Sequence, residues 1–192
     1  MTNDQLIRRD LSEHIRIIEI VRKTLSESIF GMGRKLVQVL ADGGTLFWCG
    51  NGGSAADSQH LTAELIGRSK KNVRGLRSIA LSTDTSVLTS LANDYGYDDI
   101  FARQVEALGR PGDALIGIST SGKSENVLRA LKAAKASKMT VFALLGNQGG
   151  AARDLADDSL VIPSDSTARV QEAHILIGHI LCDFIEQELG LA

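Results

Sequence analysis

The chain has 192 residues, 43% of them hydrophobic and 23% charged, with a formal net charge of −2 at pH 7. This length fits one domain with or without a helical arm, and the hydrophobic content excludes a disordered chain. Interspersed charges of both signs argue against partners such as nucleic acid or an anionic membrane, and no apolar run approaches membrane-spanning length. The polar N-terminus lacks the apolar core of a secretory signal, so we expect a cytoplasmic protein in which Cys49 and Cys182 are reduced core residues.

The N-terminal part of the chain predicts two helices. Apolar residues recur at helical spacing over residues 4–28, and a second helix is expected over about 30–41, ended by Asp42-Gly43-Gly44. Ile17 and Ile20 make the apolar stripe of the first helix wider than one neighbour requires. Packing within the chain alone and packing against another subunit both remain open. His14 lies among charged residues and is expected at the surface.

Strands alternate with helices along the rest of the chain. Strands are predicted over 45–49, 78–81, 114–118, 139–145 and 159–162, with helices from about 54 and over 87–92, 100–108, 125–137 and 168–189. This alternation predicts an α/β fold, a three-layer α-β-α sandwich with a five-stranded parallel sheet of flavodoxin-like size and an N-terminal helical arm. We expect a single domain over residues 1–192. Sites in such sheets lie at the carboxyl ends of strands, near the topological switch point.

A glycine turn, residues 50–53, joins the first strand to a helix. Free backbone N–H groups and the helix dipole make such a junction an anion-binding site. One or two turns into that helix, His60 and Glu64 are four residues apart and therefore share a face. Their spacing alone is common by chance, but it predicts an acid/base or metal pair beside the turn.

A hydroxyl loop, residues 119–124, follows the third strand and has the sequence Ser-Thr-Ser-Gly-Lys-Ser. Its hydroxyls and backbone amides are suited to surround a phosphate monoester. The alternative is an ordinary helix cap, for which one serine suffices, so we favour phosphate binding. The spacing of a nucleotide-binding P-loop is absent.

Two residues of the last helix, Gln171 and His179, are eight positions apart and share a face, whereas His174 is offset from His179. A histidine in so apolar a helix is most often a core residue. Together with His60 and Glu64, however, these side chains offer a nitrogen and oxygen ligand set suited to a tetrahedral zinc ion. Spacing alone does not place the two helices side by side.

Five segments carry a resemblance to a known family: residues 49–54, 59–68, 93–96, 118–124 and 168–179. They resemble the phosphoheptose isomerases, bacterial sugar-isomerase (SIS) domain enzymes that interconvert sedoheptulose 7-phosphate and D-glycero-D-manno-heptose 7-phosphate. The resemblance covers nearly the whole chain. Hydroxyl-rich loops occur throughout SIS domains, whereas the His60/Glu64 and Gln171/His179 pairs are far more specific.

The resemblance implies an aldose–ketose isomerase that supplies a heptose precursor of lipopolysaccharide and other surface glycans. It implies one Zn²⁺ per subunit, surrounded by His60, Glu64, Gln171 and His179. It also implies a homotetramer with active sites at subunit interfaces and the helices of residues 4–42 at those interfaces. The residues that it implies in substrate contact are Asn51, Gly52, Gly53, Glu64, Asn93, Asp94, Ser119, Thr120, Ser121, Ser124 and Gln171. Roles for Arg68 and Asp165 stay open.

Isomerisation through an enediolate needs a base beside C1 and C2 and an acid near the oxygens. We assign these roles to Glu64 and His179. Because a glutamate that ligates metal tightly is a poorer base, whether zinc is catalytic or structural stays open, as does the length of the sugar. The main alternative is a non-catalytic SIS protein, either a sugar-phosphate sensor or a regulatory scaffold like the DnaA initiator-associating protein. Since a scaffold need not keep this acid/base pair, we favour the enzyme.

Overall fold

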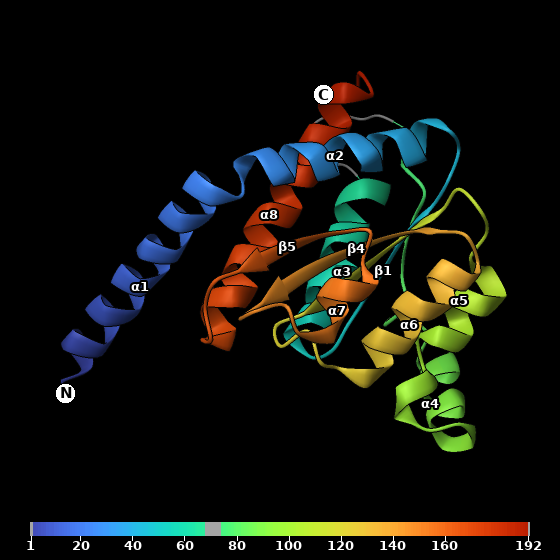
Figure 1. Cartoon of the computed structure of the whole chain (residues 1–192), viewed down its shortest axis with the longest axis horizontal. Coiled ribbons are helices and arrows are strands. Elements are labelled where there is room, and N and C mark those ends of the chain that lie inside the picture. Colours follow the sequence, from blue (N-terminus) through green and yellow to red (C-terminus); the bar gives the residue numbers. More distant parts are fainter. Residues whose placement is uncertain (1, 68–73, 192) are drawn as a thin grey trace.

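The computed structural model describes residues 2–67 and 74–191 and contains a five-stranded sheet flanked by helices (Figure 1). The strands are β1 (Leu46–Gly50), β2 (Ser78–Ala80), β3 (Ala114–Ser119), β4 (Thr140–Gly146) and β5 (Asp158–Ile162). They pair in parallel in the order β2-β1-β3-β4-β5. This is the flavodoxin-like order, whose switch point lies between β1 and β3. The predicted α/β fold and parallel sheet are confirmed.

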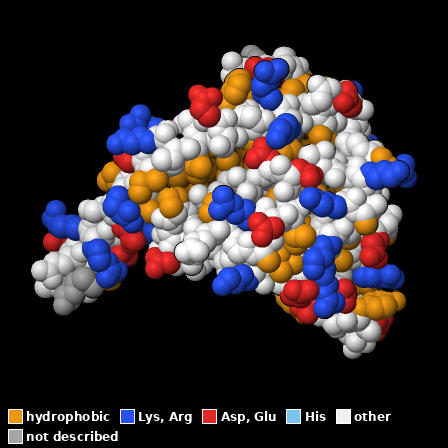
Figure 2. Space-filling model, viewed as in Figure 1, with side chains coloured by type: hydrophobic (Ala, Val, Ile, Leu, Met, Phe, Trp, Pro, Cys, Tyr) orange, Lys and Arg blue, Asp and Glu red, His pale blue; other side chains and the backbone are white. Residues whose placement is uncertain are grey.

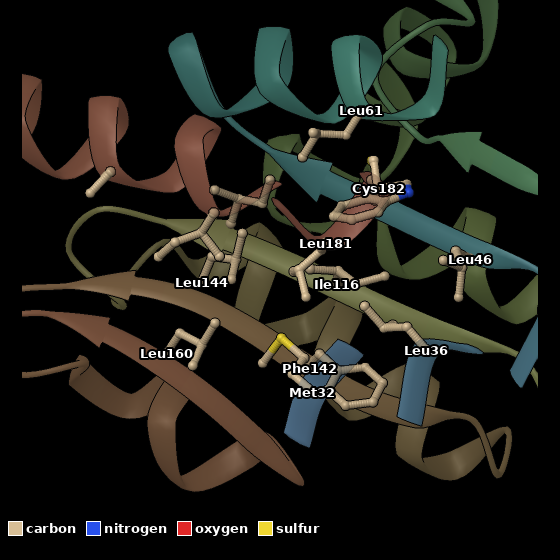
Figure 3. Packing of buried hydrophobic residues seen from close by; sticks show 14 of the residues in the cluster. Met32, Leu36, Leu46, Leu61, Ile116, Phe142, Leu144, Leu160, Leu181 and Cys182 are labelled. Carbon is tan, nitrogen blue, oxygen red and sulfur yellow. The ribbon is translucent and has the colours of Figure 1, made fainter. Parts of the chain in front are cut away.

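Helices cover both faces of the sheet. They are α1 (Asn3–Thr24), α2 (Ser26–Ala41), α3 (Gly53–Ile66), α4 (Thr85–Asp94), α5 (Ala102–Leu108), α6 (Glu125–Ala136), α7 (Gly150–Leu155) and α8 (Thr167–Glu188), with a 3₁₀ turn, η1 (Tyr97–Asp99). One apolar cluster joins α1, α2, α3 and α8 to the sheet (Figure 3), and a second joins α5, α6 and α7 to its other face. Successive strand residues point to opposite faces, so β1 gives Trp48 to the first cluster and Phe47 to the second.

The predicted boundaries of the N-terminal helices are wrong. The first helix ends at Thr24 rather than near residue 28, and the second begins at Ser26 rather than near residue 30. Leu25 separates them with a φ of −116°, while Thr24 Oγ1 donates to the Ile20 carbonyl at 2.8 Å and Ser26 Oγ to the Arg22 carbonyl at 2.6 Å. Such back-bonding bends helices. Because α1 and α2 both pack on the same cluster, apolar periodicity continues across the bend and hides it.

One helix was not predicted. After β4, Asn147 and Gly149 turn the chain with φ of +57° and +89°. The turn leads, however, into α7, whose six residues are too few for a helical apolar pattern to register. The backbone of Gly149 occupies the place of a side chain at Gly122, which has a φ of +63°, so this turn supports the hydroxyl loop.

The surface of α1 is partly apolar. This helix reaches away from the sheet (Figure 1), and only Ile17 and Val21 of its residues are buried. Leu6, Ile7 and Leu11 are 39%, 59% and 60% exposed. Figure 2 shows hydrophobic side chains gathered near the junction of α1 and α2. Within the described part of the chain, no helix combines the length and apolar character needed to cross a membrane.

Candidate active site

Helices α3 and α8 bring together three side chains from distant parts of the chain. His60 Nε2 lies 2.8 Å from His179 Nε2 and 3.5 Å from Glu64 Oε1. The two imidazole rings are nearly perpendicular, at 85°, with centroids 4.9 Å apart. One ligand atom from each of the three residues lies within 4.8 Å of the others. We call His60, Glu64 and His179 the histidine–glutamate cluster.

A glycine allows the two helices to approach closely. A side chain on Gly178 of α8 would begin 2.5 Å from Leu61 Cδ2 of α3. Leu61 is fully buried in the first apolar cluster, and protein interiors are close-packed. Because Gly178 precedes His179 and Leu61 follows His60, this contact sets the separation of the two imidazoles.

The glycine turn meets α8 through Gln171. A Cβ atom on Gly53 would lie 2.5 Å from Gln171 Nε2, so the carboxamide packs directly on the N-terminus of α3. Gly52 adopts a φ of +55°, which favours glycine. Gln171 is therefore in contact with the turn predicted to bind the sugar, two helical turns before His179 on α8.

An acidic residue near the cluster was missed from the sequence. Asp57 lies on α3, three residues before His60, and its Oδ2 atom is buried without a hydrogen-bond partner among the described residues. Burial raises the pKa of Asp57, whereas attraction to His60 and His179 lowers it. A carboxylate beside two histidines favours a cation there. The available signal was the Asp-x-x-His spacing, which places both side chains on one helix face.

The donor set fits a divalent metal. Imidazole nitrogen and carboxylate oxygen are zinc ligands, and two nitrogens on one tetrahedral ion stand about 3.3 Å apart. The two histidine nitrogens need to separate by only a fraction of an ångström from their 2.8 Å contact to reach that spacing. The buried, unpartnered oxygen of Asp57 supplies further negative charge. His60, Glu64 and His179 thus form a candidate metal site.

The hydroxyl loop lies between β3 and α6, at the carboxyl edge of the sheet. Ser119 Oγ accepts the backbone N–H of Gly122 at 3.1 Å and lies 3.1 Å from Ser124 Oγ. Ser121 Oγ accepts the backbone N–H of Lys123 at 3.2 Å. Ser124 is the N-cap of α6, yet its side chain makes no capping bond. A simple helix cap, the alternative to phosphate binding, is therefore not how Ser124 is used.

The segment that carries Asn93 and Asp94 is connected to the glycine turn through the 3₁₀ turn that follows it. Both residues end α4 and are exposed, with Asn93 Nδ2 donating to Asp94 Oδ1 at 2.8 Å. Tyr97, in η1, donates its hydroxyl to Asn51 Oδ1 at 3.0 Å and so connects this segment to the turn. Asp165 is exposed in the loop before α8. Arg68 and most of the loop that follows it lie outside the described residues.

The other two histidines, His174 and His14, lie outside the cluster and contact groups that hold the fold together. His174 is fully buried, its Nε2 lies 3.0 Å from the Leu145 carbonyl, and burial lowers its pKa to about 4. It is the core histidine that the apolar pattern of α8 predicts. His14 Nδ1 lies 2.7 Å from Glu172 Oε2 and joins α1 to α8, with 41% of its side chain exposed.

A cavity of about 810 Å³ lies at the opposite edge of the sheet, before β1, β3 and β4. Its lining includes Thr45, Asp113 and Thr140 and none of the residues described above as candidates for the site. Parallel doubly wound sheets place their sites at the carboxyl edge, where the glycine turn and the hydroxyl loop follow β1 and β3 and from which α3 leads to the cluster. We therefore assign chemistry to the cluster rather than to this cavity.

Comparison with known proteins identifies the family. Residues 11–146 match the SIS domain family. Phosphoheptose isomerase 1 of Campylobacter jejuni is 52% identical over 182 residues, which cover 95% of this chain and 97% of the relative. This chain belongs to the phosphoheptose isomerase family of SIS-domain proteins. The motif resemblance is thereby confirmed.

Solved structures of phosphoheptose isomerases have the same fold. The structure from Neisseria gonorrhoeae matches with a TM-score of 0.92 at 44% identity, and that from Francisella tularensis with 0.95 at 38% identity. Each match covers 97% of this chain and 100% of the other. The N-terminal helices are thus shared with these phosphoheptose isomerases and are not an addition peculiar to this chain.

Proposed function

We propose that this chain is a phosphoheptose isomerase that converts sedoheptulose 7-phosphate to D-glycero-D-manno-heptose 7-phosphate through an enediolate. The observation that carries the proposal is the meeting of His60 and Glu64 from α3 with His179 from α8. A proton transfer between C1 and C2 requires such an acid/base set, and α3, which carries half of it, begins at the switch point of the sheet. A regulatory scaffold has no need of such a set.

Glu64 acts as the carbon base in this proposal. Its carboxylate removes a proton from one of the two carbons and returns a proton to the other, so the net charge of the residue is unchanged after turnover. His179 gives a proton to one oxygen and takes one from the other during the same interconversion, through the ring nitrogen that does not face His60. The 3.5 Å contact of Glu64 with His60 holds the carboxylate toward His179, because His60 also contacts His179 at 2.8 Å.

We further propose that the cluster holds one zinc ion per subunit, with Gln171 as the fourth ligand. When bound, zinc supplies a Lewis acid that stabilises negative charge on the substrate oxygens. His60, Glu64 and His179 provide nitrogen and oxygen donors from two helices. The carboxylate of Asp57 offsets part of the positive charge.

The substrate contacts in the proposal follow the two loops at the carboxyl edge. The hydroxyl loop binds the phosphate through Ser119, Thr120, Ser121 and Ser124, since the hydroxyls and the uncapped N-terminus of α6 offer neutral donors. The sugar lies along Asn51, Gly52, Gly53 and Gln171, with Asn93 and Asp94 beside them. Holding the far phosphate aligns C1 and C2 with Glu64 through remote binding energy.

The working form in the proposal is a cytoplasmic homotetramer of single SIS domains, with active sites at subunit interfaces. Three apolar side chains of α1 are 39% to 60% exposed in the isolated chain, which favours burial against another subunit. His60 and His179 are also exposed in the isolated chain, as expected for a site completed by a neighbour. The buried, free thiols of Cys49 and Cys182 agree with a reducing compartment.

The test is to incubate the zinc-loaded protein with sedoheptulose 7-phosphate and follow the aldose product by NMR. We expect conversion to an equilibrium mixture of ketose and aldose. A parallel incubation with a five-carbon ketose phosphate controls for substrate length. Conversion of the shorter sugar alone would replace the proposed substrate, and conversion of neither would contradict an isomerase.

A further inference from the structure

A buried asparagine connects α6 to the glycine turn. Asn126, on the first turn of α6, is 2% exposed. It exchanges two hydrogen bonds with Asn51: Asn51 Nδ2 donates to Asn126 Oδ1, and Asn126 Nδ2 donates to Asn51 Oδ1, each at 2.8 Å. Tyr97 adds a third bond by donating to Asn51 Oδ1 at 3.0 Å.

The directions of these bonds follow from one backbone group. The backbone N–H of Val127 donates to Asn126 Oδ1 at 2.9 Å, and a backbone N–H has no capacity to accept. The Asn126 atom that faces it must therefore be the oxygen, which leaves the NH₂ group of Asn126 to donate to the oxygen of Asn51. The Tyr97 hydroxyl then faces an acceptor and must donate. No other arrangement of the two carboxamides satisfies all four groups.

This pattern leaves one side-chain N–H group of Asn51 without a hydrogen-bond acceptor among the described residues. Its oxygen already accepts two bonds, and one of its two N–H groups is given to Asn126. For the remaining N–H, the described residues offer no acceptor. We propose that Asn126 and Tyr97 are positioning residues that orient Asn51 so that this N–H donates to a hydroxyl or carbonyl oxygen of the sugar. The inference rests on the proposed contact of Asn51 with the substrate.

Helix α6 also fixes the other segments that are proposed to contact the substrate. The hydroxyl loop leads directly into α6, which carries Asn126. One turn further along α6, Arg129 Nη1 donates to Asp99 Oδ2 at 2.8 Å and so fixes η1, from which Tyr97 reaches Asn51. The glycine turn, the hydroxyl loop and the Asn93–Asp94 segment are thus attached to one helix. A donor fixed in this way loses less conformational freedom when substrate binds.

The test removes a single hydroxyl. Tyr97→Phe keeps the ring of an exposed residue and deletes only the bond to Asn51, so folding is preserved. We expect kcat/KM for sedoheptulose 7-phosphate to fall roughly fivefold to tenfold. Competitive inhibition by inorganic phosphate should be unchanged, because the hydroxyl loop is intact. Tyr95→Phe is the matched control, since that exposed ring stacks on Arg103 and makes no bond to the turn; its kcat/KM should stay within about twofold of wild type.

A double-mutant cycle shows whether Tyr97 acts through Asn51. In an Asn51→Ala background, adding Tyr97→Phe should cause no further loss, because the group that it orients is gone. If the two losses multiply instead, Tyr97 acts independently and the inference is overturned. An unchanged kcat/KM in the single variant would overturn it as well.

A readout without turnover separates this inference from the proposed function. In wild type, the side-chain NH₂ resonances of Asn126 should exchange slowly with water. Tyr97→Phe should shift those of Asn51 while Tyr95→Phe leaves them in place. If the wild-type protein turns over no sedoheptulose 7-phosphate, the proposed function fails. The orientation of Asn51 by Tyr97 and Asn126 is then tested by these shifts alone, and their absence would contradict it.

Discussion

Two histidines on α8, five residues apart, have opposite surroundings. His174 is buried against the carbonyl of Leu145, whereas His179 is exposed and faces His60 across the α3–α8 contact. Desolvation disfavours the charged form of His174, so it stays neutral in the folded protein at neutral pH. The same residue type thus serves packing at one position and is available for proton transfer at the other.

Burial of His174 makes stability depend on pH. Burial lowers its pKa to about 4 in the folded state, from an ordinary value of 6.5. Between these two pH values His174 is protonated in the unfolded chain and neutral in the folded one, so the protein loses stability as the pH falls. Below about pH 4 His174 is protonated in both states and causes no further change. As the pH falls through that window, the free energy of unfolding should decrease in both proteins. We expect the decrease to be about 3 kcal/mol smaller in His174→Gln than in wild type.

Chemical denaturation at a series of pH values measures this difference. Equal slopes for wild type and His174→Gln would show that His174 is not held neutral by burial.

Asp57 is expected to strengthen metal binding through its charge. Asp57→Asn keeps the shape of the side chain and removes the negative charge beside His60 and His179. We expect zinc affinity, measured by competition with a chelator, to fall about tenfold to a hundredfold. Asp154→Asn, an exposed change on α7, is the matched control and should bind zinc as wild type does. Equal affinities for Asp57→Asn and wild type would remove Asp57 from the site.

At the scale of elements, the site depends on how closely α3 and α8 pack. Gly178 on one helix lies against Leu61 on the other, and each is adjacent to a histidine of the cluster. A larger residue at this contact would separate the two imidazoles without touching either of them. Helix spacing is therefore part of the site.

Gly178→Ala tests that spacing. The new methyl group would press on buried Leu61, and we expect a loss of about 1–3 kcal/mol in the free energy of unfolding together with weaker zinc binding. Gly31→Ala in α2 is the control, because nothing lies within 4 Å of its Cβ position. That change should be neutral or stabilise the protein by up to about 1 kcal/mol. Zinc affinity and stability equal to wild type in Gly178→Ala would contradict the role of this contact.

Much of the element pattern is predictable from sequence, because buried strands and glycine turns leave local signals. The strands near Trp48 and Ile116 lie within one residue of their predicted ends. The bend at Leu25 was not predictable, since hydroxyl back-bonding leaves the apolar period intact. Nor was the meeting of His60 with His179, which depends on tertiary packing. Only the family motifs connected those two residues before the structure did.

At the scale of the whole molecule, α1 has more apolar surface than its own chain covers. Ile7, Leu11 and Ile15 are 59%, 60% and 63% exposed. Near Asp10 and His14 the helix attaches to α8 through polar groups, because the Asp10 carbonyl accepts from Arg169 and His14 contacts Glu172. Its buried apolar packing is confined to Ile17 and Val21, nearer its C-terminal end. An apolar stripe left uncovered beside a polar attachment favours a second subunit as its partner.

Leu11→Glu tests the assembly. A charge in the apolar stripe should be tolerated in the isolated chain, where Leu11 is exposed, but should disfavour burial against another subunit. We expect analytical ultracentrifugation to show wild type as a tetramer and the variant as smaller species with reduced turnover. Ser12→Glu adds the same charge at the next exposed position and is the control. A tetramer of unchanged stability in Leu11→Glu would place the interface elsewhere.

In the proposed function Glu64 and His179, from distant parts of the chain, form one catalytic site. Its most direct test is the turnover of sedoheptulose 7-phosphate by Glu64→Gln, with zinc content and sugar-phosphate binding measured on the same sample. Glu188→Gln, at the exposed end of α8, is the control. We predict that Glu64→Gln loses about a thousandfold in kcat while it still binds the sugar phosphate, because the amide cannot act as a base. Turnover at the wild-type rate would contradict the claim.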